Sequence, residues 1–285
     1  MAAIHLSDVT ARLGDSLPQA FPFTVPVLRT FERLELTTPV TFFVGENGSG
    51  KSTLLEAIAC AVGSITVGSQ NIRTDPSLAD IRAYADRLKL GWKLKRNRKG
   101  FFMRAEDFFG YVREQERMRE EMLRDMAGID EEYADRSDYA KALARSGFAR
   151  ELGDMQQRYG DGLDVASHGE SFFKLFRSRF IPGGLYLLDE PEAPLSPLRQ
   201  LTFLSLLKQM VDRDAQFIIV THSPILMAYP GAQILSFDGG AVQPIAYDQT
   251  EHVSVTRGFL NNPDAYLRPL MAEESDDENE DDRNA

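Results

Sequence analysis

The chain has 285 residues, of which 43% are hydrophobic and 26% are charged, and its formal net charge is −11. These values are ordinary for a soluble globular protein, and we expect a single α/β domain that carries an inserted lobe. Apolar runs such as residues 217–220 are far shorter than the roughly 20 residues of a membrane span, so we expect no intrinsic membrane segment and a cytoplasmic protein. The single cysteine, Cys60, excludes an intrachain disulfide.

The negative charge is concentrated at the C-terminus. Residues 271–285 hold eight acidic residues against one base, which leaves a net charge of −4 for the rest of the chain. A segment with so few apolar groups does not fold alone, so we predict that 271–285 is a disordered acidic tail, with an interaction role as the alternative. The small net charge of residues 1–270 therefore does not exclude nucleic acid as a partner.

The first predicted elements are two antiparallel strands, residues 4–12 and 31–37, in which apolar and polar residues alternate. Three apolar runs are each typical of a strand buried on both faces of a mostly parallel sheet: 39–44, 185–188 and 216–220. Polar residues follow each run, at the edge where parallel sheets bind ligands. Residues 232–246 predict a hairpin through Asp238-Gly239-Gly240.

Between Gly63 and Ser167 the pattern becomes charged and helical, notably at 79–90 and 111–126. We expect this region, about residues 64–165, to be a helical lobe inserted in the α/β core of a domain spanning 1–270. The run 111–126 lacks sustained apolar heptads, so we interpret it as a solvated helix face rather than a coiled coil.

Residues 45–52, Gly-Glu-Asn-Gly-Ser-Gly-Lys-Ser, lie between a predicted strand and a predicted helix. In this pattern the glycines let backbone N–H groups surround phosphates at a helix N-terminus, while Lys51 reaches the β- and γ-phosphates and the Ser52 hydroxyl binds Mg²⁺. The predicted nucleotide-binding residues are Gly45, Glu46, Asn47, Gly48, Ser49, Gly50, Lys51, Ser52 and Thr53. The loop therefore predicts binding of ATP with Mg²⁺.

The strand predicted at 185–188 ends in two adjacent carboxylates, Asp189 and Glu190. We predict that Asp189 holds the Mg²⁺ shell and that Glu190 polarises the attacking water. An acidic pair by itself is equally compatible with a solvated turn. Its position downstream of a phosphate-binding loop favours ATP hydrolysis.

A third motif, Ser167-His-Gly-Glu-Ser171, opens a predicted helix and starts 22 residues before Asp189. With the phosphate-binding loop and Thr221-His222-Ser223, its order and spacing resemble the ABC-type ATPases. The resemblance implies that Ser167, Gly169 and Glu170 form the nucleotide-binding signature motif. It also implies that His222 contacts the γ-phosphate and that Pro194-Leu195-Ser196 is the loop following the acidic pair.

The sequence departs from the common ABC pattern at two places. The signature motif has His168 at its second variable position and closes on Glu170-Ser171. Transporter-type members of the family also carry a glutamine at a strand end between the loop and the signature, and Gln70 comes early for that role, only 19 residues after Lys51. We place Glu106 there, at the end of a strand predicted over 100–106, where its carboxylate would meet Mg²⁺ or water; the alternative is a surface charge.

Nearly the whole chain, including Thr250-Glu-His252 and residues 259–263, resembles a small family of stand-alone bacterial ABC-type ATPases. These proteins are commonly labelled AAA-family ATPases and are related to the ATPase heads of RecF and structural-maintenance proteins. The resemblance implies a P-loop fold with a mixed, mostly parallel sheet. It further implies a head-to-tail homodimer that sandwiches ATP and acts as a switch, with Glu190 as the base.

Residues 89–104 contain seven bases and no acid, interleaved with Trp92, Phe101 and Phe102. The bases are Lys89, Lys93, Lys95, Arg96, Arg98, Lys99 and Arg104. Such a strip suits phosphate contacts with some base stacking, although a solvated loop has the same composition. We therefore expect an ATPase that acts on DNA or on a partner protein in genome maintenance or defence. The alternatives are the ATPase subunit of a membrane transporter, with a separate membrane partner, and a P-loop kinase.

Overall fold

The structure is a computed structural model, and it describes residues 3–14, 16–67, 72, 74–93, 96–97, 99–159 and 168–271. Within these ranges the side chains of residues 130–132, 151, 154–159 and 168–171 are not described. Four features of the sequence lie wholly or mainly outside the described residues: Gln70, the pair Lys95 and Arg98, Ser167, and residues 272–285 of the predicted tail.

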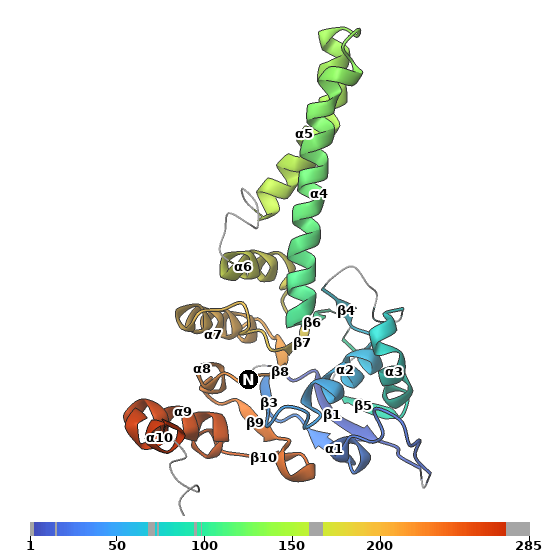
Figure 1. Ribbon diagram of the computed structural model, residues 1–285. Helices are drawn as coiled ribbons and strands as arrows, with labels where there is room; N and C mark the ends of the chain where they lie inside the picture. The colour runs from blue at the N-terminus through green and yellow to red at the C-terminus, as the bar shows by residue number, and fades with distance from the viewer. Residues whose placement is uncertain are drawn as a thin grey trace, which may run out of the picture.

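The centre of the molecule is a seven-stranded sheet with the strand order β10-β9-β3-β8-β7-β6-β4 (Figure 1). All neighbouring pairs are parallel except β9 and β10, which form the predicted hairpin. The strands are β3 (Val40–Val44), β4 (Ile65–Thr66), β6 (Phe101–Arg104), β7 (Leu185–Asp189), β8 (Gln216–Val220), β9 (Gln233–Ser236) and β10 (Gln243–Pro244). The three apolar runs of the sequence are thus adjacent central strands, and the predicted α/β fold with a mixed sheet is confirmed.

Alternate residues of the central strands enter two different cores. Phe43 packs in the core under helix α2 (Lys51–Val62), whereas Phe42 packs in the core under helices α6 (His168–Arg179) and α7 (Pro197–Val211). This follows from the two-residue period of a strand, which sends successive side chains to opposite faces. The sheet therefore separates α2 from α6 and α7.

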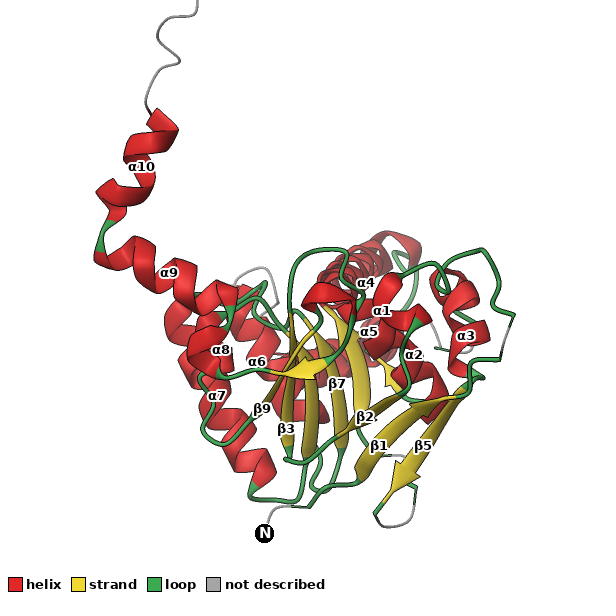
Figure 2. Ribbon diagram, turned by 90° about the horizontal axis from the view of Figure 1, so that it is seen from below, coloured by secondary structure: helices red, strands yellow, loops and turns green. Residues whose placement is uncertain are grey.

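A second, antiparallel sheet has the order β2-β1-β5 and lies beside the main sheet (Figure 2). Its strands are β1 (Leu6–Ala11), β2 (Arg33–Glu35) and β5 (Leu88–Trp92), so the predicted antiparallel pairing of the first two segments is confirmed. The buried Gln216 side chain ties the sheets together: it accepts from the His5 and Leu6 N–H groups and donates to the Leu6 carbonyl.

The expected helix over 79–90 is only half correct. Helix α3 (Ala79–Ala85) ends before residue 88, and β5 then pairs with β1, with Val9 opposite Leu90. The short helices α1 (Pro26–Arg29) and η1 (Pro76–Leu78) complete this side of the molecule. Pairing with a distant strand overrides the local helical preference, which no window of sequence reveals.

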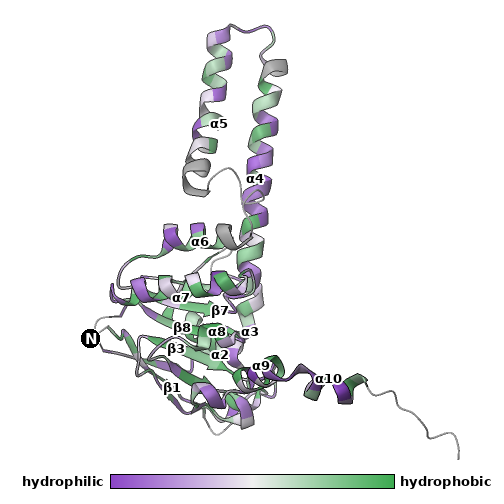
Figure 3. Ribbon diagram, turned by 90° about the vertical axis from the view of Figure 1, so that its left-hand side faces the viewer, coloured by the Kyte–Doolittle hydropathy of each residue, from purple (hydrophilic) through white to green (hydrophobic). Residues whose placement is uncertain are grey.

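Two long helices, α4 (Ala105–Glu132) and α5 (Asp138–Tyr159), form an antiparallel hairpin that projects from the sheet (Figures 1 and 3). The helical lobe starts at Ala105 and not near residue 64, because β4, β5 and β6 occupy the intervening segment and complete both sheets. Arg117 pairs with Glu114 and Glu121 along the exposed surface of α4. The charged run is therefore a solvated helix face, as expected, although α5 lies alongside.

Most of the C-terminal part lies on the side of α6 and α7, but Phe237, at the turn of the β9–β10 hairpin, packs in the core under α2. It comprises α8 (Pro224–Met227), η2 (Asp238–Gly240), η3 (Tyr247–Gln249), α9 (Glu251–Asn261) and α10 (Pro263–Met271). Helix α10 projects away from the body (Figures 2 and 3). It ends at Met271, which is the first residue of the predicted tail. No helix among the described residues is long and apolar enough to cross a membrane.

Candidate functional site

The phosphate-binding loop connects the end of β3 to the start of α2, as the sequence predicts. Gly45, Gly48 and Gly50 have φ angles of 136°, 80° and 99°, a region that side-chain-bearing residues rarely adopt. A Cβ atom on Gly50 would also lie 2.6 Å from the Cγ1 atom of Val27. The three glycines are therefore required for the curl of the loop, and Gly50 is also required for its close packing.

Lys51 is the first residue of α2, and its side chain folds back into the loop. Its Nζ atom donates to the carbonyl oxygens of Gly45 and Glu46, at 2.7 and 2.6 Å. Burial lowers the Lys51 pKa, and the nearby carboxylates, Asp238 first among them, oppose this shift. The Asp238 carboxylate also accepts from the Glu46 N–H at 2.8 Å, so the β9–β10 hairpin supports the loop.

Ser52 and Asp189 meet where α2 begins and β7 ends: the Ser52 hydroxyl donates to Asp189 Oδ1 at 3.0 Å. Burial, reinforced by Glu190 and Glu192, raises the Asp189 pKa to about 7, while the Ser52 hydrogen bond opposes the shift. A buried carboxylate beside a hydroxyl is a donor set that fits Mg²⁺. No group of three His, Cys, Asp or Glu side chains suited to a metal occurs among the described residues.

Glu190 follows β7 in a left-handed backbone conformation, with φ of 50°. Its N–H donates to the Val220 carbonyl at the end of β8, which fixes this conformation. Left-handed geometry at a residue other than glycine is uncommon and clusters at functional sites. The Glu190 carboxylate consequently lies 3.5 Å from His222 Nε2, and the structure brings these two predicted residues together.

Two residues that the motifs do not assign hold His222. Glu192 is partly buried and accepts from the His222 N–H and the Thr221 hydroxyl, both at 2.7 Å, and burial raises its pKa. His252, at the start of α9, lies 2.8 Å from His222 through the atoms Nε2 and Nδ1. Burial lowers the His222 pKa, with Lys51 and His252 acting in the same direction. Thirty residues of sequence separate each partner from His222, so sequence spacing carries no signal for either contact.

A family profile described as "AAA domain" matches residues 24–142, and one described as "AAA domain, putative AbiEii toxin, Type IV TA system" matches residues 175–228. Both matching models are AAA domains, and these matches indicate a P-loop ATPase. The two matches cover the phosphate-binding loop, the Asp189-Glu190 pair and His222.

The ATPase is similar to the macrolide export ATP-binding/permease protein MacB of Shigella dysenteriae, at 28% identity over 230 residues. MacB of Escherichia coli K12 is 29% identical over 227 residues. These matches cover 76% and 75% of this chain but 31% and 30% of the relatives, so the chain spans less than a third of their length.

Solved structures with a similar outline are too distant to carry an argument about function. The Smc head domain of Pyrococcus furiosus has 11% identity and a TM-score of 0.44, and the SMC head domain of Thermotoga maritima has 17% and 0.41. The matches cover 90% and 85% of this chain and 99% and 100% of those chains. CbiO1 of Clostridium perfringens has 14% identity and a TM-score of 0.44, over 93% of this chain and 100% of that chain.

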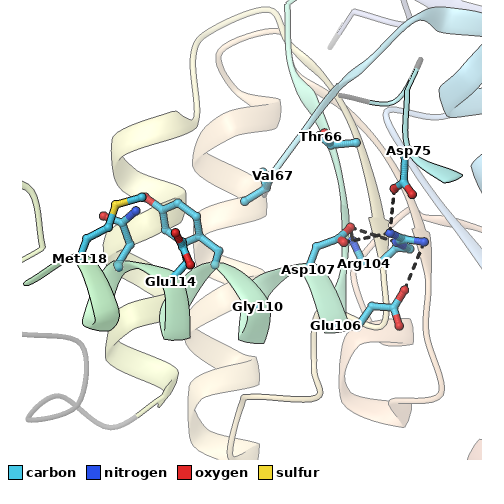
Figure 4. A pocket seen from close by; sticks show the side chains of 11 residues that line it. Thr66, Val67, Asp75, Arg104, Glu106, Asp107, Gly110, Glu114 and Met118 are labelled. Atoms are coloured by element: carbon cyan, nitrogen blue, oxygen red, sulfur yellow. Dashed lines mark hydrogen bonds and ion pairs between the residues drawn. The ribbon is translucent and has the colours of Figure 1, made fainter. Parts of the chain in front are cut away.

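The strand predicted over 100–106 is shorter in the structure, where β6 ends at Arg104. Glu106 therefore lies just past β6, which pairs with the strand that ends in Asp189. The register pairs Arg104 with Asp189, and Glu106 belongs to the first turn of α4. Its side chain is 72% exposed, and its ion pair is with Arg104 Nη1 at 3.2 Å (Figure 4). A role for Glu106 at Mg²⁺ therefore stays a prediction.

Arg104 is the centre of an ion-pair cluster in the ATPase, beside a cavity of about 570 Å³ (Figure 4). Its guanidinium lies between 3.0 and 3.5 Å from the carboxylates of Glu56, Asp75, Glu106 and Asp107. Glu56 comes from α2, whereas Asp107 comes from α4. The cluster thus joins the base of the helical hairpin to the helix that follows the phosphate-binding loop.

Replacement of Glu56 is expected to remove a pH dependence of stability. Burial raises its pKa from 4.5 to about 7, against the opposing charge of Arg104. Since the folded state binds this proton more tightly, the stability it contributes is full below pH 4.5 and is lost as the pH rises through 7. Glu56→Gln, which keeps an acceptor for Arg104, should abolish a loss of about 3 kcal/mol between pH 4.5 and 8 in urea unfolding.

The exposed Glu121 provides a control for this measurement, because Glu121→Gln removes a carboxylate that pairs only at the surface of α4. Its pH profile should follow that of the wild type. Other buried acids titrate in the same direction, so the decisive quantity is the difference between wild type and Glu56→Gln. Parallel pH profiles of these two proteins would contradict the prediction.

The prediction that residues 89–104 form a surface for base stacking and phosphate contacts is largely wrong. Phe101 and Phe102 are buried in the cores, and Arg104 is engaged by the carboxylates described above. Arg96 Nη2 donates to the carbonyl oxygens of Ala61 and Val62, at the end of α2. The described bases that remain exposed without such a structural role are Lys89, Lys93 and Lys99.

Two residues of the predicted signature motif, Gly169 and Glu170, occupy the first turn of α6. Farther along, α6 is anchored by a cluster of aromatic rings that spans α6, α7 and the sheet. Its members are Phe101, Phe172, Phe176, Phe180, Tyr186, Phe203 and Phe217. The start of α6 and the helix that follows the phosphate-binding loop do not share a face of the sheet, since α2 and α6 cover opposite faces.

Proposed function

We propose that this ATPase is a homodimeric switch in which ATP joins two copies head to tail. The observation that carries the proposal is the separation of α2 and α6 by the main sheet, because each helix begins with a segment predicted to bind the same nucleotide. A second copy supplies the missing half: Ser167, Gly169 and Glu170 of one protomer complete the phosphate-binding loop of the other. A helix N-terminus is suited to this contact with an anion.

Within each composite site the proposed roles follow from the contacts. Lys51 neutralises the β- and γ-phosphates, and Ser52 and Asp189 hold Mg²⁺, which supplies charge neutralisation when it is bound. Glu190 accepts a proton from the attacking water, and His222 donates a hydrogen bond to the γ-phosphate. Hydrolysis removes the contact that joins the protomers, and the dimer opens.

Mixing two inactive variants tests the shared site. Lys51→Ala removes the phosphate contact, and Ser167→Arg blocks the signature motif, so each pure protein should be nearly inactive. An equal mixture forms heterodimers in which one of two sites is intact, and it should recover about a quarter of the wild-type ATPase rate. Phosphate release at saturating ATP measures this recovery. A mixture as inactive as its components would rule out a site shared between protomers.

For the client, we propose DNA or a partner protein in genome maintenance or defence, in the cytoplasm. The hairpin of α4 and α5 supports this, because it projects from the body and begins at the Arg104 cluster beside the strand that ends in Asp189 (Figure 1). Stimulation of the ATPase by duplex or single-stranded DNA tests the DNA alternative, with Lys89, Lys93 and Lys99 replaced together by alanine as the matched variant. A salt-insensitive rate unaffected by DNA favours a protein client.

The alternative function is the ATPase subunit of a membrane transporter. The similarity to the MacB export proteins supports it, although this chain covers less than a third of their length. Copurification with a membrane protein, followed by ATPase stimulation on reconstitution, would favour the transporter over the switch acting on DNA or a soluble protein.

A further inference from the structure

The His222 and His252 rings form a direct contact that joins the site of hydrolysis to helix α9. The atoms Nδ1 of His222 and Nε2 of His252 are 2.8 Å apart, and the ring planes are inclined by 55°. On its other side, His222 Nε2 faces the Glu190 carboxylate at 3.5 Å. His222 therefore lies between a proton acceptor and a second imidazole.

The two contacts constrain where the protons lie. A distance of 2.8 Å between ring nitrogens requires one proton between them, since two N–H groups or two lone pairs would repel. The Glu190 carboxylate favours a proton on His222 Nε2, because a lone pair there would face a negative charge. Burial and the neighbouring Lys51 lower the His222 pKa, which favours a neutral ring with a single proton. That leaves His222 Nδ1 as the acceptor and His252 Nε2 as the donor.

His252 is held firmly enough to select one arrangement. It belongs to the first turn of α9, between the buried residues Thr250 and Val253. The Thr250 hydroxyl donates to the Tyr247 carbonyl, and the Tyr247 hydroxyl donates to the Pro224 carbonyl at the start of α8. Because α8 directly follows the His222 loop, both histidines are anchored to the same local framework.

We infer that His252 is a positioning residue that fixes His222 in the tautomer with its proton on Nε2. In this tautomer the N–H of His222 points toward the catalytic edge, where it can donate to an oxygen of the γ-phosphate. Without His252 the ring can place its proton on Nδ1 or rotate, and the donor is lost. The hydrogen bond made by one ring nitrogen generally decides which nitrogen carries the proton. The inference rests on the role of His222 given under the proposed function.

Two substitutions separate hydrogen bonding from simple loss of bulk. His252→Ala removes the donor, whereas the amide nitrogen of His252→Gln takes the place of the Nε2 donor. His252→Ala should lower kcat for ATP hydrolysis by about 10-fold with little change in KM, and His252→Gln should recover most of this loss. Ser254→Ala, on the exposed side of the same helix, is the control and should retain the wild-type rate.

Nitrogen-15 NMR of the imidazole groups tests the tautomer itself in the full chain. The protein has four histidines, so comparison with His222→Gln assigns the His222 signals. We expect Nε2–H for His222 in the wild type and in His252→Gln, and a mixture with Nδ1–H in His252→Ala. A wild-type His222 protonated on Nδ1, or an unchanged His222 tautomer in folded His252→Ala, would overturn the inference.

This spectrum also distinguishes the inference from the catalytic role of His222. If His222→Ala hydrolyses ATP at the wild-type rate, the proposed contact of His222 with the γ-phosphate is wrong. The His222 tautomer in the wild-type protein still shows whether His252 positions the His222 ring. If His252→Ala does not fold, the wild-type spectrum and His252→Gln remain decisive. Equal kcat losses in His252→Ala and His252→Gln, with both proteins folded and the tautomer unchanged, would leave only a structural role and contradict the positioning.

Discussion

Glu190→Gln is expected to lower kcat for ATP hydrolysis by about 100- to 10,000-fold, because the variant keeps the shape of the side chain but cannot accept a proton from water. The left-handed backbone at Glu190 and its bond to the Val220 carbonyl should position the amide as they position the carboxylate. ATP affinity should stay within a few-fold, since Lys51 and the loop are unchanged. Single-turnover phosphate release and equilibrium binding of a fluorescent ATP analogue separate the two quantities.

The same variant tests the switch, since bound ATP that is not hydrolysed should hold the two protomers together. Light scattering with saturating ATP and Mg²⁺ should give twice the 32.0 kDa mass of one chain. Glu35→Gln, an exposed change on β2, serves as the control and should hydrolyse ATP normally. A Glu190→Gln protein that binds ATP but remains monomeric would contradict the dimer, whereas one with a normal rate would contradict the role of Glu190 as base.

Phe176→Ala is expected to cost about 3–5 kcal/mol of unfolding free energy, because it leaves a cavity in the aromatic cluster beneath α6. The Phe176 side chain is fully buried, and its ring centroid lies 4.1 to 5.8 Å from those of four neighbours. These ring contacts belong to the cluster that anchors α6 to α7 and to the sheet. Urea unfolding followed by circular dichroism measures the change.

A matched control for this variant is Phe259→Ala. Phe259 is partly exposed and has Tyr266 of the neighbouring α10 as its ring contact, so its removal should cost about 0.5 kcal/mol or little more. Similar losses in the two variants would mean that the cluster beneath α6 does not contribute beyond ordinary packing. ATP-dependent dimerisation of Phe176→Ala at low temperature would show whether anchoring of α6 also supports the signature motif.

Local patterns were sufficient for the parts of the ATPase whose chemistry lies in consecutive residues. The glycine spacing in residues 45–52 predicts the phosphate-binding loop because a left-handed backbone needs glycine at those positions. Apolar runs that end in polar residues predict the central strands and the sheet edge where Asp189 lies. In each case the pattern and the structure it specifies occupy the same few residues.

Longer-range pairing limited what patterns could predict. Residues 88–92 continue a helical pattern but form β5, because β1 offers an unpaired edge more than 75 residues away in the sequence. Phe101 and Arg104 looked like parts of a basic surface, yet β6 lies between two other strands and its side chains enter a core and an ion-pair cluster. Composition indicates charge but not which carboxylates a cation will meet.

The sequence by itself determined the chemistry proposed for this protein: a loop predicted to surround phosphate, a hydroxyl and a carboxylate proposed for Mg²⁺, and an adjacent acid proposed for hydrolysis. These assignments need only adjacent residues and the common edge of parallel strands. Only the tertiary structure decided that α2 and α6 lie on opposite faces, that Arg104 joins four carboxylates, and that His252 contacts His222. Such contacts arise when distant segments pack together, and the free energy that selects them is not contained in any one segment.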